Sequence, residues 1–102
     1  MFSKVYNLRF TSLSEAKIAL SFLTENIGGC IATDNIASLN IFLDKEGCIA
    51  ITVRFDTLAE LSNFEKKRGE LLSDLRKSFT VKLDHMSAVA VFTFEREATL
   101  TQ

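Results

Sequence analysis

The sequence contains few of the residues on which metal and nucleophilic sites depend. Its 102 residues include one histidine, His85, one tyrosine, Tyr6, two cysteines and no tryptophan. The cysteines, Cys30 and Cys48, form no CxxC pair and have no histidine near them at zinc-ligand spacing. One histidine cannot fill several catalytic roles, and no P-loop, GxGxxG or HExxH motif is present. We therefore predict neither a metal site nor a cofactor.

An excess of positive charge is also lacking. The 12 Lys and Arg residues are balanced by 13 Asp and Glu residues, which gives a formal net charge of −1. No overall field then attracts nucleic acid or anionic lipid. The apolar runs, such as residues 88–92, are far shorter than the roughly 20 residues that cross a bilayer. Residues 1–10 alternate in polarity, unlike a signal peptide. We expect a cytoplasmic protein without nucleic acid or membrane partners.

What the sequence does contain is a globular balance of residues. Hydrophobic residues make up 47% of the chain and charged residues 25%, and no low-complexity segment interrupts the pattern. A chain of this length can bury a core of its own. We predict a single domain over residues 1–97 and a frayed tail over residues 98–102.

The first half of the chain shows the pattern of a strand, a helix and a hairpin. Residues 2–10 alternate between apolar and polar side chains, as in a half-buried strand. Residues 36–43 and 48–55 are strand-like and flank a turn at residues 44–47, which predicts a hairpin. The helix between the first strand and the hairpin is predicted to begin at a capping box of Ser12 and Glu15. It is predicted to end where Gly28 and Gly29 adopt left-handed conformations.

The second half predicts another helix and one or two further strands. A capping box of Thr57 and Glu60 opens a helix whose apolar stripe is predicted to begin at Leu58 and to include Leu61, Phe64, Leu71 or Leu72, and Leu75. The charged run at residues 65–70 in its middle is typical of a solvated face. Residues 79–84 and 88–95 are both strand-like, and His85 lies where a turn is expected between them. The pattern leaves open whether they form one bulged strand or two short strands.

This order of elements predicts an α+β domain with the ferredoxin-like β-α-β-β-α-β fold, in which both helices cover one face of an antiparallel sheet. An extra C-terminal strand remains open. The larger apolar sets belong under the helices: Phe2, Tyr6, Leu8, Phe10, Ile49, Ile51, Val53 and Phe55. The opposite face is only partly apolar, because residues such as Val5 and Ala50 alternate there with polar ones. A second copy would cover that face, so we predict a homodimer.

The stretch from Phe55 to Phe64, FDTLAELSNF, follows the hairpin and opens the second helix. Together with the order of elements, it resembles the dimeric α+β barrel superfamily, which includes the antibiotic-biosynthesis monooxygenase-like and stress-responsive barrel domains. The resemblance implies that two sheets face each other in a homodimer and that a small-molecule pocket lies between each sheet and its helices. Superfamily members range from cofactor-independent oxygenases to proteins without known activity, so whether this chain is an enzyme stays open.

A monooxygenase-like activity, which the resemblance implies, requires polar groups that take a proton and stabilise an enolate or phenolate. Tyr6 as a hydrogen-bond donor and His85 as a proton shuttle are the candidate catalytic residues. The alternatives are a core aromatic for Tyr6 and a surface loop residue for His85. Arg9 and Arg54 share a sheet face and could bind a carboxylate, or could instead be solvated or contact the second copy.

Two other classes of protein share the order of elements. An RNA-recognition motif requires exposed aromatics on its third strand, where residues 47–53 contain none, so this class is disfavoured. A regulatory domain of the ACT type pairs the same unit side by side and binds amino acids between the copies. A non-catalytic regulatory or structural dimer of this kind remains the alternative to the monooxygenase-like protein.

Overall fold

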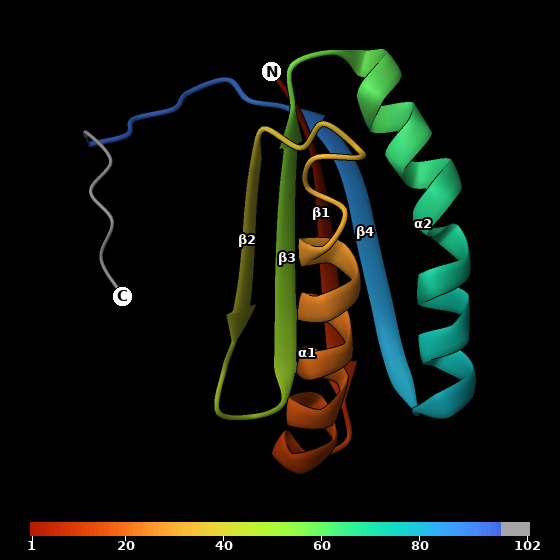
Figure 1. The fold of residues 1–102 in the computed structure, drawn as a ribbon. Helices are drawn as coiled ribbons and strands as arrows, with labels where there is room; N and C mark the ends of the chain where they lie inside the picture. The colour runs from red at the N-terminus through yellow and green to blue at the C-terminus, as the bar shows by residue number, and fades with distance from the viewer. Residues whose placement is uncertain (97–102) are drawn as a thin grey trace.

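The computed structural model describes residues 1–96 and contains the predicted ferredoxin-like fold (Figure 1). The strands form one antiparallel sheet in the order β2-β3-β1-β4, and both helices cover the same face of it (Figure 1). The tail predicted at residues 98–102 lies outside the described residues. The elements are β1 (Phe2–Phe10), α1 (Leu13–Gly28), β2 (Ser38–Leu43), β3 (Cys48–Phe55), α2 (Leu58–Ser78) and β4 (Val81–Val89).

Both helices begin at the predicted caps. Thr57 and Glu60 form a complete capping box, in which each side chain binds the backbone amide of the other residue. At α1 the box is half formed. The Ser12 hydroxyl accepts a hydrogen bond from the Glu15 amide, but the Glu15 carboxylate accepts from the hydroxyl of Thr11. Each helix therefore has a side-chain acceptor for one of its free N-terminal amides.

The prediction that Gly28 and Gly29 adopt left-handed conformations is wrong. Gly29 caps α1 with a φ of −70°, and the chain leaves the helix through a right-handed turn. The glycine that needs a positive φ is Gly47, with φ of 94° in the turn between β2 and β3. A Cβ there would also lie 2.8 Å from the carbonyl oxygen of Ser12. Gly47 thus allows the hairpin turn to pack against the start of α1.

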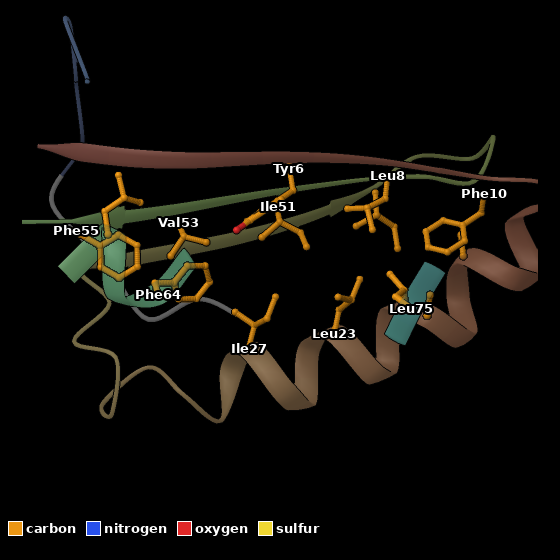
Figure 2. Packing of buried hydrophobic residues seen from close by; sticks show 14 residues of the cluster. Tyr6, Leu8, Phe10, Leu23, Ile27, Ile51, Val53, Phe55, Phe64 and Leu75 are labelled. Atoms are coloured by element: carbon orange, nitrogen blue, oxygen red, sulfur yellow. The ribbon is translucent and has the colours of Figure 1, made fainter. Parts of the chain in front are cut away.

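The core lies between the helices and the face of the sheet that the alternation predicted. Phe55 of β3 is fully buried and stacks at 5.2 Å from Phe64 of α2 (Figure 2). Leu58, expected on the buried stripe of α2, is 57% exposed, because that stripe begins one turn later at Leu61. The buried apolar residues are Tyr6, Leu8, Phe10, Ala16, Ala19, Leu23, Ile27, Ile49, Ile51, Val53, Phe55, Leu61, Phe64 and Leu75.

The last strand settles the ambiguity over residues 79–95. β4 runs without interruption from Val81 to Val89 and pairs with β1 along its whole length. The turn expected at His85 is absent, because that residue pairs with Tyr6 in the middle of the strand. β1 begins at Phe2, opposite Val89, so within residues 1–96 the chain finds no further partner strand after Val89.

The face of the sheet opposite the helices is uncovered in the single chain. Phe42 and Met86 are 56% and 57% exposed on it, and Ala50 and Val5 lie between them in the register. After β4, residues 90–96 cross from β4 toward the β2 side of the sheet (Figure 1), where Glu95 contacts Arg54 of β3, and Phe92 is 85% exposed. Among residues 1–96, neither helix has the length and apolar content needed to span a membrane.

Candidate functional site

A nearly buried lysine lies on the helix side of the sheet. Lys4 of β1 is 4% exposed, and its Nζ lies 2.9 Å from Glu65 Oε2, 3.0 Å from His85 Nδ1 and 3.2 Å from Ser87 Oγ. A buried ammonium is costly unless its donors are satisfied. Here each of its three hydrogens has an acceptor, supplied by α2 and β4. The hydrogen bonds of Lys4 thus connect β1 to α2 and to the edge strand β4.

The ammonium also determines which hydrogens His85 can offer. Since Nδ1 accepts from Lys4, the neutral imidazole carries its own hydrogen on Nε2. His85 therefore presents a donor to a ligand. Glu65 is the acceptor of the network, and its side chain is 37% exposed, so water or a ligand can reach its carboxylate. The Ser87 hydroxyl lies 3.4 Å from the same carboxylate.

Tyr6 completes the cluster. Its ring lies 6.3 Å from the ring of His85, its partner in the sheet, and the Lys4 ammonium lies 5.6 Å from its centroid. The phenol oxygen points from β1 toward the helix layer (Figure 2) and forms no hydrogen bond within residues 1–96. Burial, and then the negative charge of Glu65, raise the pKa of Tyr6 to about 12. The hydroxyl therefore stays protonated at neutral pH and is available as a donor.

These side chains line one end of an open cleft of about 570 Å³ between α2 and the β1–β4 pair. Gly69, Leu72 and Leu83 line its middle. The far end has Ser73, Arg76 and Lys77 from the last turns of α2. The cleft thus combines a polar cluster, a small apolar middle and a basic end, and an organic molecule bound along it would contact all three.

The structure separates the other two predicted site residues from this cleft and from each other. Arg9 and Arg54 both lie on the open face of the sheet. Arg9 pairs with Cys48, the first residue of β3, whereas Arg54 lies near the end of that strand, about 20 Å away at the usual rise per residue. One chain therefore does not bring them onto one carboxylate. The Arg54 Nη1 binds Glu95 Oε1 at 2.7 Å, and Arg9 borders a hollow of about 620 Å³ on the open face.

Three residues of the cluster, Lys4, Glu65 and Ser87, were not predicted from the sequence. Ser87 belongs to the segment in which a turn was expected. Lys4 occupies an even position of β1, like the buried residues Tyr6, Leu8 and Phe10. A lysine on the otherwise apolar face of the strand could have indicated a buried charge. Glu65 belongs to the charged run expected to be solvated, but it follows Leu61 by one helical turn and borders the buried stripe of α2. Neither position alone identifies its partner, because the pairing depends on how α2 crosses the sheet.

No protein-family model matches the chain, and no curated protein matches its sequence. Solved structures share its fold. A dimeric ferredoxin-like protein from an uncultured marine organism superposes with a TM-score of 0.70 at 20% identity, over 93% of this chain and 98% of that chain. A Deinococcus radiodurans protein, provisionally assigned as an antibiotic biosynthesis monooxygenase, has a TM-score of 0.78 at 18% identity, over 96% and 100%.

A third similar structure, HapK from Hahella chejuensis, has a TM-score of 0.62 at 9% identity and covers 96% of this chain and 100% of that one. At these identities the likeness concerns the fold, and residue roles do not transfer with it. The comparisons match the resemblance inferred from residues 55–64. The chain therefore has the ferredoxin-like fold, and its structural neighbours include dimeric ferredoxin-like proteins and the Deinococcus radiodurans protein.

Proposed function

We propose that this chain is a homodimeric α+β barrel protein that binds a small organic molecule in the cleft beside Lys4 and performs monooxygenase-like chemistry on it. The observation that carries the proposal is the buried Lys4 ammonium, held at the wall of an open cleft next to the unpartnered hydroxyl of Tyr6. A hydrophobic residue at position 4 would serve the core at lower cost, so a buried charge beside a cleft favours a functional role.

The cluster suits the stabilisation of an oxyanion. Tyr6 and the Nε2 hydrogen of His85 are donors, and hydrogen bonds from such groups stabilise an enolate or phenolate as its negative charge develops. The hydrogens of Lys4 are engaged by Glu65, His85 and Ser87, so Lys4 contributes its positive charge beside the anion. Glu65 is the accessible carboxylate that can accept the proton released when the anion forms. Tyr6 thus keeps its predicted role of a donor, whereas His85 becomes a donor in place of a proton shuttle, and Glu65 is the proton acceptor.

In the proposed reaction, a CH₂ group conjugated with a carbonyl loses a proton to give an enolate or phenolate, which reduces O₂. One oxygen atom becomes a new carbonyl oxygen of the product. The other leaves as water with the two hydrogens of the CH₂ group, so that R₂CH₂ and O₂ give R₂C=O and H₂O. The substrate supplies the electrons, and no resident cofactor takes part.

The homodimer is proposed from the open face of the sheet. Large apolar side chains are exposed on this side of the chain, among them Phe42, Met86, Phe92 and Phe94, and a second copy would cover them. The dimeric assembly described for two of the structural neighbours supports the same arrangement. We propose that two sheets face each other and that residues 90–95 of each copy pack against its partner, which would bury Phe92 and Phe94.

Oxygen uptake with anthrone as the probe tests the enzymatic part. Anthrone has a CH₂ group across its central ring from a ketone and conjugated to it through the fused aromatic rings, and its oxidation to anthraquinone follows the stoichiometry above. We expect wild type to accelerate O₂ uptake and Lys4→Met to lower kcat about 10²-fold or more, since the positive charge beside the anion is lost together with the hydrogen bond that orients His85. Lys66→Met, which removes an exposed lysine of α2, is the control.

If anthrone binds in the cleft without accelerated O₂ uptake, the alternative of a non-catalytic ligand-binding dimer replaces the enzymatic proposal. If Lys4→Met oxidises anthrone as fast as wild type does, the oxyanion role of the cluster is wrong. Isotope-labelled O₂ adds a direct check, because one labelled atom should appear in anthraquinone.

A further inference from the structure

The two ends of the cleft differ in their balance of charge. At one end, the Lys4 ammonium is neutralised by Glu65 at 2.9 Å. At the other end, neither Arg76 nor Lys77 forms an ion pair with any carboxylate in the described part of the chain. Basic residues are common in the last turn of a helix, where the helix dipole places about half a negative charge. Two full positive charges exceed that requirement and leave a cationic end to the cleft.

The middle of the cleft is kept open by a glycine. Gly69 lies inside α2, where glycine destabilises a helix relative to alanine. A Cβ at this position would meet no atom within 4 Å, so packing does not exclude a side chain there. Leu72 and Leu83 line the same part of the cleft. The missing side chain therefore leaves room beside an apolar wall.

The spacing of these features limits the shape of a ligand. Gly69 and Arg76 are about two helical turns apart, or roughly 10 Å along the axis. Side chains on a helix lean toward its N-terminus, so the guanidinium of Arg76 reaches back toward the apolar middle. A body of one or two rings between the cationic end and Tyr6 fits this span.

We infer that the ligand is an organic carboxylate with an apolar body, with its carboxylate at Arg76 and Lys77 and its opposite, oxygen-bearing end at Tyr6. The inference rests on the proposed function, because it specifies the class of molecule that the same cleft takes. Arg76 is suited to paired hydrogen bonds with a carboxylate, and Lys77 adds a second charge. Neutral molecules of the same shape would leave both cations without a partner.

Calorimetric titration with 2-naphthoate and 2-naphthamide tests this charge selectivity, since the two probes share a ring system and differ in charge. We expect wild type to bind the carboxylate about tenfold more tightly than the amide. Arg76→Gln with Lys77→Gln should reduce the ratio of the two dissociation constants to about twofold or less. Lys45→Gln with Lys66→Gln removes two exposed charges outside the cleft and should retain the ratio.

Gly69→Leu separates failure of the inference from failure of the proposed site. This variant fills the cleft from α2, and Ser73→Trp does the same from an exposed position of that helix. Each variant should weaken the binding of both probes about tenfold. If wild type binds the two probes equally and these variants abolish the binding, the inference of an anionic ligand is wrong but the cleft remains the binding site. Binding that both cleft-filling variants leave unchanged would overturn the site itself. Absence of binding of either probe to wild type would also reject the inferred ligand class.

Discussion

The Lys4 ammonium of β1 lies 2.9 Å from the Glu65 carboxylate of α2, and this pair joins two elements across 61 positions of the chain. The lysine is buried and the glutamate is partly exposed, so the two partners are not equivalent. Removing the glutamate leaves a buried charge with one acceptor fewer, whereas removing the lysine leaves a carboxylate that water can reach.

This asymmetry predicts the stability of the variants. Glu65→Leu should lower the free energy of unfolding by about 1–3 kcal/mol, because a buried donor loses its charged acceptor. Lys4→Met with Glu65→Leu should recover most of that loss, since no buried charge remains. Urea denaturation measures both changes. Glu70→Leu, an exposed glutamate of the same helix, should change stability by about 0.5 kcal/mol or less. A double variant less stable than Glu65→Leu would contradict this account of the pair.

Two glycines should respond in opposite ways to the same substitution. Gly69→Ala should raise the free energy of unfolding by about 0.5–1 kcal/mol, because the new methyl group enters open space within a helix. Gly47→Ala should lower it, because φ is 94° and the Cβ would lie 2.8 Å from the Ser12 carbonyl oxygen. Thermal and urea denaturation measure both changes, and each variant is the control for the other. Stabilisation by Gly47→Ala would show that the turn differs from the structure described.

The single tyrosine allows its ionisation to be measured without interference from other tyrosines. Its pKa is raised to about 12 by burial and by Glu65, so the phenolate absorbance of the folded protein should appear well above the ordinary pH of 10. In urea it should appear near the ordinary value. Glu65→Gln should lower the pKa in the folded protein, and a folded protein that ionises near pH 10 would contradict the buried environment of Tyr6.

The same shift predicts how stability depends on pH. Below pH 10, Tyr6 is protonated in both the folded and unfolded states, so its contribution to stability is fully present. As pH rises toward about 12, the unfolded chain loses the proton first, and stability falls. Tyr6→Phe should lack this part of the loss. As pH increases across this range, the urea midpoint of wild type should therefore fall relative to that of Tyr6→Phe.

The open face of the sheet predicts a mass of twice 11.4 kDa by light scattering at micromolar concentration. Ala50→Glu should shift the protein toward the monomer, because Ala50 lies between Asn7 and Phe42 on that face and a charge there would lose its hydration. Ala59→Glu adds the same charge at an exposed position of α2 and should retain the dimer. A wild-type monomer would exclude the paired barrel.

Alternation and capping residues were enough to predict most of the fold. The buried faces of β1 and β3 follow from their period of two, and Thr57 and Glu60 begin α2 where their spacing predicts. His85 was misplaced because Asp84, His85, Met86 and Ser87 include few strand-forming residues. Pairing with β1 over the full length of β4 outweighs that weak local preference.

The site was only half predictable. Tyr6 and His85 were candidates because each is the sole residue of its type, but their adjacency depends on the register of β4 against β1. The pairing of Lys4 with Glu65 depends on where α2 crosses the sheet, which local patterns do not encode. Arg9 and Arg54 lie on the same face of the sheet as expected, yet nearly the whole length of β3 separates them. The alternation of side chains along a strand predicts which face a residue is on, but not how far apart two residues on that face lie.

The most direct test of the proposed cleft uses the four glycines as probes of position. Gly69 lines the cleft, whereas Gly28 and Gly29 lie at the end of α1 and Gly47 in the turn between β2 and β3. An amide ¹H–¹⁵N spectrum of ¹⁵N-labelled wild type, titrated with 2-naphthoate, reports on all four glycines at once. We expect the Gly69 signal to move in a saturable manner while the other three stay in place. A fixed Gly69 signal, or movement centred on Gly47, would contradict the assignment of the ligand site to the cleft beside Lys4.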